Sequence, residues 1–166
     1  MRKLIGAALV ATAMATGSGT VEAQQNVVGV WRLVAYTAVD ADSGAVIEPF
    51  GSAPKGVLHY TAGGRMAAVL SAGDRKRFSA GNRINAPVEE RAEAFSTSTA
   101  YAGTYTLEGD RVTHHVEIAT NPDWVGGDQL RYPKVEGNRL TITTPPLPTR
   151  PDGKLRVSTL VWERAE

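Results

Sequence analysis

The sequence of 166 residues contains no cysteine. This absence excludes disulfide bonds, thiol nucleophiles, zinc sites built from thiolates and attachment of a lipid to an amino-terminal cysteine. The fold must therefore depend on its hydrophobic core alone. A chain of this length buries roughly two-thirds of the surface that its unfolded form exposes, which is sufficient without covalent cross-links.

The sequence also lacks a surplus of either charge. Its 18 Lys and Arg residues face 17 Asp and Glu residues, and setting aside Arg2, Lys3 and Glu22 with the leader described next leaves 16 of each. Binding of nucleic acid requires a basic surplus clustered on one face, and the short basic run at 75–77 is interpreted as a solvated loop. We expect no nucleic acid partner. We also expect no stable membrane insertion, because no later stretch is apolar for long enough to span a bilayer.

The first residues have the pattern of an export signal. Two basic residues precede an apolar segment at 4–15, and the small-residue sequence Val21-Glu22-Ala23 resembles a cleavage site. We predict a signal peptide over residues 1–23 and a single domain over residues 24–166. The expected location is periplasmic or secreted, without a lipid anchor.

Enzyme signatures are missing as well. The sequence has no nucleophile elbow of the GxSxG type, no HExxH helix, no phosphate-binding GxxxxGK[ST] loop and no GxGxxG turn. His114 and His115 are adjacent in a predicted strand, so they point to opposite faces and cannot readily bind one metal ion together. We expect neither a metal nor a cofactor; a haem held by one axial histidine is the remaining alternative.

What the sequence does contain is a series of short apolar runs separated by turns. Gly, Asp and Asn gather at 40–44, 61–65, 107–111 and 135–139, and these residues tolerate the conformations of tight hairpins. The pattern predicts an all-β, antiparallel, up-and-down barrel, because closure removes the exposed edges of a long meander. The predicted strands cover residues 29–38, 45–48, 56–61, 65–71, 101–107, 111–119, 128–135, 139–144 and 155–163.

One short α-helix is expected within 86–99. Asn85 is the predicted N-cap, the acidic residues of the first turn favour the positive end of the helix dipole, and Val88 and Phe95 fall on one face. We expect this helix to pack over the barrel.

The run GVWRLVAY at 29–36 predicts how the barrel closes. Trp31 is placed to fill one end, and Gly29 allows a second backbone segment to approach. The first and last strands of such a barrel are neighbours, so the guanidinium of Arg164 is expected over the indole of Trp31. The alternative is an ordinary core tryptophan and an ordinary surface arginine.

The chain resembles the bacterial and fungal lipocalin-like domain proteins, which are related to the calycin barrels. The resemblance covers nearly all of residues 24–166 and implies an antiparallel barrel whose interior takes a small, largely apolar molecule. It implies little about chemistry. The segments that carry it are GVWRLVAY (29–36), PFGSAPKGVLHYTAGGRMAAVLSAGDRK (49–76), AYAGTYTLEGDRVTHHVEI (100–118), NPDWVGGDQLRY (121–132), NRLTITTPP (138–146) and LVWER (160–164).

Strand alternation leaves two assignments open for the polar residues of the two strands at 111–119 and 128–135. The ordinary assignment puts the apolar face of each strand inward. The reverse assignment points the polar faces, which include His115, Glu117, Gln129 and Arg131, into the barrel as a hydrogen-bonding cluster. The resulting candidate ligand-binding residues are Tyr60, Tyr101, Tyr105, His115, Glu117, Gln129 and Arg131.

Three functions fit these features. The first is an exported protein, a monomer or weak dimer, that binds or carries a small hydrophobic molecule. The second is a cofactor-independent isomerase or cyclase that uses His115 as base with Glu117, Arg131 or a tyrosine. The third is an interaction or inhibitor module, which predicts an exposed apolar patch near the loop at 73–83 or the loop at 121–127.

Overall fold

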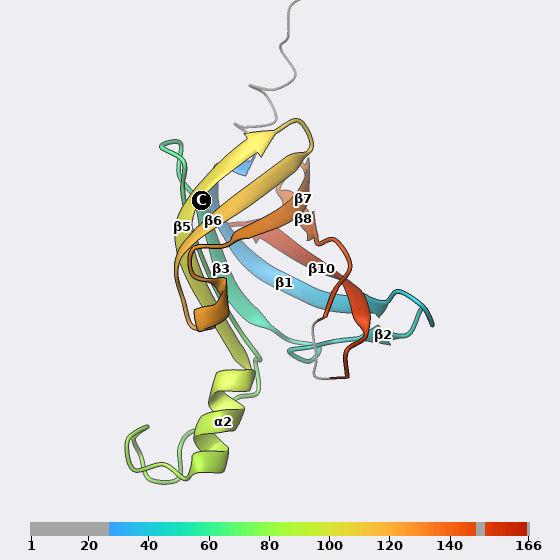
Figure 1. The fold of residues 1–166 in the computed structure, drawn as a ribbon. Coiled ribbons are helices and arrows are strands. Elements are labelled where there is room, and N and C mark those ends of the chain that lie inside the picture. The colour runs from blue at the N-terminus through green and yellow to red at the C-terminus, as the bar shows by residue number, and fades with distance from the viewer. Residues whose placement is uncertain (1–26, 149–151, 166) are drawn as a thin grey trace, which may run out of the picture.

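The computed structural model describes residues 27–148 and 152–165, and the predicted signal peptide lies outside them. Eight antiparallel strands form a closed barrel (Figure 1). Two further strands of two residues each pair with barrel strands: β2 (Val46–Ile47) pairs with β1, and β9 (Leu147–Pro148) pairs with β10. The barrel strands are β1 (Gly29–Asp40), β3 (Lys55–Tyr60), β4 (Arg65–Ser71), β5 (Ser98–Glu108), β6 (Arg111–Ala119), β7 (Asp128–Glu136), β8 (Arg139–Thr143) and β10 (Leu155–Arg164).

The order of the strands confirms the predicted up-and-down barrel. β1 pairs with β3, each of β3 to β7 pairs with the next strand along the chain, β8 pairs with β10, and β10 pairs with β1 to close the ring. In this last pairing Trp31 lies opposite Arg164. The predicted strands correspond to the observed ones within three residues at each end, apart from β9, which was not predicted.

The predicted hairpins join β1 to β2, β3 to β4, β5 to β6 and β7 to β8. Gly64 and Gly109 occupy the second and third of these turns with φ of 78° and 60°. A residue with a Cβ rarely adopts this conformation, which explains why glycine marks the turns in the sequence.

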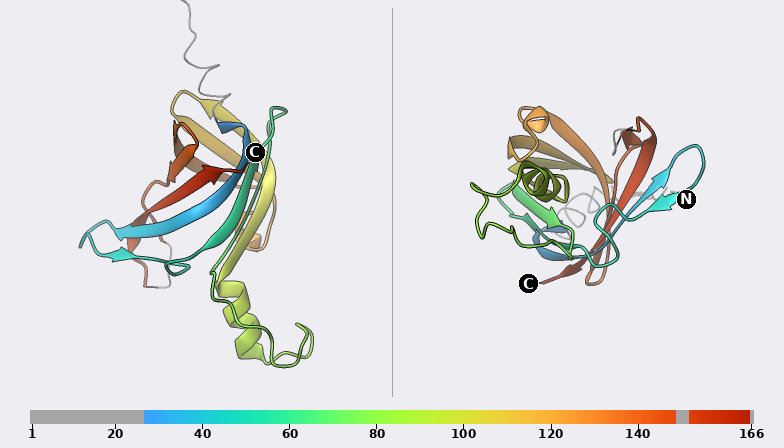
Figure 2. Two further views of the ribbon diagram at one scale, coloured as in Figure 1. Left: turned by 180° about the vertical axis from the view of Figure 1, so that it is seen from behind. Right: turned by 90° about the horizontal axis from the view of Figure 1, so that it is seen from below.

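The two ends of the barrel differ. At the end where β1 begins and β10 finishes, buried Trp31 and Trp162 fill the interior together with Leu58 and Leu140. At the other end, tyrosines that point inward keep some exposure: Tyr36 and Tyr101 are half-buried. We call these the closed end and the open end. The carboxyl terminus lies at the closed end, opposite the helix (Figures 1 and 2).

The helix α2 (Val88–Ser96) forms where the sequence predicts one, but two details of the prediction are wrong. Pro87, and not Asn85, occupies the N-cap position. The helix extends away from the open end below β4 and β5 (Figures 1 and 2), and none of its residues is buried. The 3.6-residue periodicity of the sequence indicates that the helix has an apolar face. It gives no information on which part of the protein packs against that face, so the packing of α2 over the barrel could not be predicted from it.

In the described part of the chain, no helix combines the length and apolar character that a membrane crossing requires.

Candidate functional site

The closed end is held by the contact that the sequence predicts. The guanidinium carbon of Arg164 lies 4.1 Å from the centre of the Trp31 ring, and Arg164 Nη1 donates to the carbonyl of Val28 at 2.8 Å. Trp31 itself is fully buried, and its Nε1 donates to Val27 at 2.8 Å. Gly29, with φ of 137°, pairs with Tyr60 of β3 at the same end. These contacts join the first and last strands to the segment that precedes β1.

A chain of hydrogen bonds crosses the interior from the closed end towards the open end. The hydroxyl of Tyr60, from β3, is 2.5 Å from His114 Nε2, and the hydroxyl of Tyr101, from β5, is 3.0 Å from His114 Nδ1. Tyr60 and His114 are 0 % and 1 % exposed, whereas Tyr101 is half-buried. The polar chain therefore begins in the core and ends where solvent reaches the interior.

Burial sets the protonation states of His114, Tyr60 and Tyr101. The pKa of His114 falls from 6.5 to about 3, first because burial disfavours the charged ring and then because the positive charge of Arg131 lies nearby. The imidazole is neutral at pH 7, so it has one donor and one acceptor nitrogen. Burial also raises the pKa values of Tyr60 and Tyr101, so both phenols stay protonated.

The tautomer of His114 follows from the complete burial of Tyr60. Among the described residues, His114 is the only hydrogen-bond partner of the Tyr60 hydroxyl. If Tyr60 accepted from the ring, its own O–H would be buried without an acceptor, which costs roughly 1–3 kcal/mol. Tyr60 therefore donates to Nε2, and Nδ1–H donates to Tyr101. The O–H of Tyr101 is then left to donate to a group inside the barrel.

Arg131 and Gln129, both from β7, complete this wall. Arg131 is 9 % exposed. It donates to the carbonyl of Leu130 at 2.7 Å and to the side-chain oxygen of Gln129, and its guanidinium lies beside the Tyr101 hydroxyl. The interior thus has an arginine, an amide and a phenol close together.

The grouping of His115 and Glu117 with Gln129 and Arg131 is wrong. The pairing of β6 with β7 places His114 opposite Gln129, so the inward face of β6 carries His114 and the outward face carries His115 and Glu117. His115 Nδ1 contacts Asp128 at 2.7 Å on the exposed outer surface. An active site with His115 as base beside Arg131 is not formed.

Glu117 is also on the outside. Arg65 of β4 binds it through two hydrogen bonds of 2.9 and 2.8 Å, with both side chains about half exposed.

Tyr105 points inward but takes no part in the hydrogen-bond chain. Its ring packs against Tyr60 at 4.8 Å between centroids, and its hydroxyl donates to the carbonyl of Thr61 at 2.9 Å. Tyr105 belongs to the closed end, and of the three predicted tyrosines only Tyr60 and Tyr101 contact His114.

Sequence reasoning missed two residues of this interior, His114 and Phe50. His114 was assigned to the apolar face of its strand and was not considered as a ligand contact; its place between Val112 and Val116 was the available signal. Trp124, in the short helix η1 (Pro122–Trp124), packs edge-on against Tyr101 at 5.6 Å. Phe50 packs edge-on against Tyr36 at 5.3 Å from the loop between β2 and β3, and no pattern in that loop indicated it.

A second buried charge cluster lies at the open end, between β1 and β10. Arg156, which is 5 % exposed, donates to both carboxylate oxygens of Asp152 at 2.9 and 2.5 Å and lies 3.9 Å from Asp40. Hydrogen bonds from Ser43 lower the pKa of Asp40 to about 2, and those from Arg156 lower the pKa of Asp152 to about 2. This arginine is neutralised by its neighbours.

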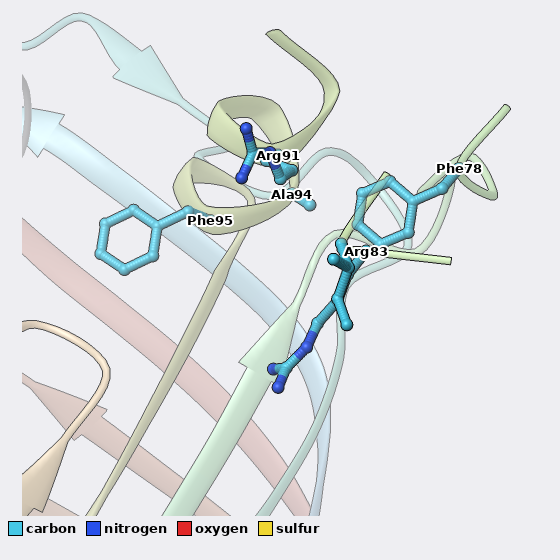
Figure 3. A pocket seen from close by; sticks show the side chains of 6 residues that line it. Phe78, Arg83, Arg91, Ala94 and Phe95 are labelled. Carbon is cyan, nitrogen blue, oxygen red and sulfur yellow. The ribbon is translucent and has the colours of Figure 1, made fainter. Parts of the chain in front are cut away.

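Two hollows lie outside the polar wall. A groove of about 610 Å³ runs where β1 and β3 separate, lined by residues that include Leu33, Gly56 and Leu70. A pocket of about 450 Å³ lies between α2 and the loop before it, lined by Phe78 and Arg83 of that loop and by the helix residues Arg91 and Ala94 (Figure 3).

Exposed apolar side chains surround the open end. Among the described residues, the large apolar side chains that are well exposed all belong to the open half of the barrel or to its loops and α2. They are Val46, Val57, Val69, Ile84, Val88, Phe95, Ile118, Val125, Leu147 and Leu155.

Groups of three or more potential metal ligands are absent from residues 27–148 and 152–165.

Residues 28–165 match the lipocalin-like domain family, and the chain belongs to this family. No curated protein sequence matches it. A lipocalin-like protein from Bacteroides uniformis is similar in structure, with 13 % identity, a TM-score of 0.42 and coverage of 84 % of this chain and 98 % of that one. An uncharacterised protein from Bacteroides eggerthii aligns with 11 % identity, a TM-score of 0.39 and coverage of 82 % and 98 %.

Proposed function

We propose that this lipocalin-like protein binds a small, amphipathic molecule inside its barrel. One observation carries the proposal. The core cluster of the barrel is apolar, yet one part of the wall, separate from the neutralised Arg156 cluster, has a chain of polar groups from Tyr60 through His114 to Tyr101 and Arg131. A few convergent polar groups in an apolar enclosure are the usual means of orienting a small ligand.

The position of this wall supports the proposal. If its groups served stability alone, the polar chain would be expected to end in a satisfied partner within the core. It ends instead at half-buried Tyr101, beside half-buried Gln129, at the end of the barrel that solvent reaches. The indole Nε1 of Trp162, also inside the barrel, is buried without an acceptor among the described residues.

Native mass spectrometry of the protein purified from its own host tests this function. A bound small molecule that is released on denaturation and absent from a Trp124→Arg variant would support it, because Trp124 packs on Tyr101 at the open end. A protein that carries no ligand, and binds none from an extract of host lipids, would contradict it.

We also propose that the protein works outside the cytoplasm. The support is the sequence of residues 1–23, with its basic start, apolar segment and small-residue cleavage site. Mass spectrometry of the protein from its host should show Gln24 as the first residue. A chain that retains residues 1–23 would contradict export.

The exposed apolar residues around the open end favour a second candidate, an interaction module. Ile84 and Phe95 are 79 % and 57 % exposed, and Val125 and Ile118 are exposed as well. This function predicts that Ile84→Ser and Phe95→Ser change the sedimentation of the protein in host extract and leave ligand binding intact. Unchanged sedimentation would count against it.

A further inference from the structure

Arg131 is a buried cation without an anionic partner among the described residues. It is 9 % exposed, and its hydrogen bonds go to two neutral oxygens, the Leu130 carbonyl and the Gln129 amide. None of the ion pairs formed by residues 27–148 and 152–165 includes it. A buried charge is unfavourable unless it is paired, so this arrangement is costly in the absence of an anion.

The rest of the molecule shows how unusual this is. Arg156 is buried to a similar extent, and two carboxylates surround it. Even on the outer surface, Arg32 and Arg65 pair with Glu163 and Glu117. Arg131 is therefore the buried arginine that the described chain leaves without a counter-ion, and it lies on the inward face of β7, opposite buried Val112.

The groups beside Arg131 are donors. The tautomer of His114 leaves the O–H of Tyr101 without an acceptor, and the amide nitrogen of Gln129 is a further donor once its oxygen accepts from Arg131. His114 itself is neutral. The only uncompensated charge on this wall is that of one guanidinium, so a ligand with one negative charge would neutralise it.

We infer that the barrel binds an apolar molecule with a single carboxylate, which accepts hydrogen bonds from Arg131 and the Tyr101 hydroxyl. This inference rests on the proposed function and specifies its ligand class. The planar guanidinium matches the two oxygens of a carboxylate, and such pairs are short and strong. The apolar part of the ligand lies against the remaining inward side chains, among them Tyr36 and Leu160.

Isothermal titration with decanoate and with decan-1-ol tests the inference, because the two probes share an alkyl chain and differ in charge. The wild-type protein should bind decanoate at least about 30-fold more tightly, equivalent to about 2 kcal/mol at 1.4 kcal/mol per tenfold. Arg131→Gln should remove this preference and retain binding of the alcohol, and Arg131→Lys should restore part of it. Arg111→Gln, an exposed arginine at the start of β6, is the matched control and should change neither affinity.

The outcomes separate the two proposals. Equal affinity of the wild-type protein for both probes would overturn the carboxylate inference and leave the binding function in place. Failure of the wild-type protein to bind either probe would contradict both. The wild-type comparison decides the inference even if Arg131→Gln does not fold, and Arg131→Lys supplies a second variant that keeps the charge.

Discussion

The buried imidazole of His114 makes a specific prediction about stability at mildly acidic pH. In the folded protein its pKa is about 3, and an unfolded chain returns it to 6.5. Between these values the unfolded state binds more protons than the folded state, so stability rises with pH. The contribution of the neutral ring is fully present above about pH 6.5 and is lost as the pH falls towards 3.

The size of the effect follows from the two pKa values. Each pH unit below 6.5 lowers the free energy of unfolding by about 1.4 kcal/mol, so pH 5 removes about 2 kcal/mol relative to pH 8. That is a large part of the roughly 5–15 kcal/mol by which such domains are stable. Asp40 and Asp152 do not contribute to this change between pH 5 and pH 8, because their pKa values of about 2 mean that they lose their contributions only below about pH 4.

Urea unfolding at pH 8 and pH 5 measures the effect. The wild-type protein should lose about 2 kcal/mol on acidification, whereas His114→Gln, which keeps hydrogen-bonding groups and does not titrate, should lose much less. His115→Gln on the outer surface is the matched control and should behave as the wild-type protein does. A wild-type stability that does not change over this interval, or a slope removed by His115→Gln, would refute the reasoning.

Three further predictions concern named contacts. Arg164→Gln should destabilise the protein by about 1–2 kcal/mol, seen in urea unfolding, because it removes the cation over Trp31. Gly103→Ala should destabilise by about 3 kcal/mol or more, seen as a lower melting temperature, because the new Cβ would lie 1.9 Å from the His115 carbonyl oxygen. Glu117→Gln should change stability by less than about 1 kcal/mol and leave decanoate affinity unchanged, because its ion pair is exposed.

Each of these has a control. Arg111→Gln removes an exposed arginine and should cost less than about 1 kcal/mol; an equal loss in Arg164→Gln would show that the indole contact adds nothing. Gly63→Ala meets only Thr61 Oγ1 at 3.9 Å and should be tolerated, so similar melting temperatures for both alanine variants would contradict the predicted clash. Weaker decanoate binding in Glu117→Gln would place the ligand on the outer surface.

The barrel could be predicted from the sequence because its determinants are local. Each hairpin needs a residue that accepts positive φ, and Gly64 and Gly109 supply it. The contact of Trp31 with Arg164 could also be predicted, since closure of an up-and-down barrel pairs the first strand with the last.

The composition of the interior could not be predicted in full because it depends on register. Alternation shows that His115 shares a face with Glu117 and that Gln129 shares a face with Arg131; it does not relate one strand to the other. Pairing of His114 with Gln129 turns the apolar face of β6 and the polar face of β7 inward together. A rule that places apolar faces inside the barrel is correct for β6. It is wrong for β7, where the face that carries Arg131 points inward.

A crystal structure of the protein soaked with decanoate tests the central claim most directly. The account predicts the carboxylate within hydrogen-bond distance of the Arg131 guanidinium and the Tyr101 hydroxyl, with the alkyl chain inside the barrel. Decanoate in the groove beside Gly56, or in the pocket between α2 and its preceding loop, with the surroundings of Arg131 unchanged, would contradict it.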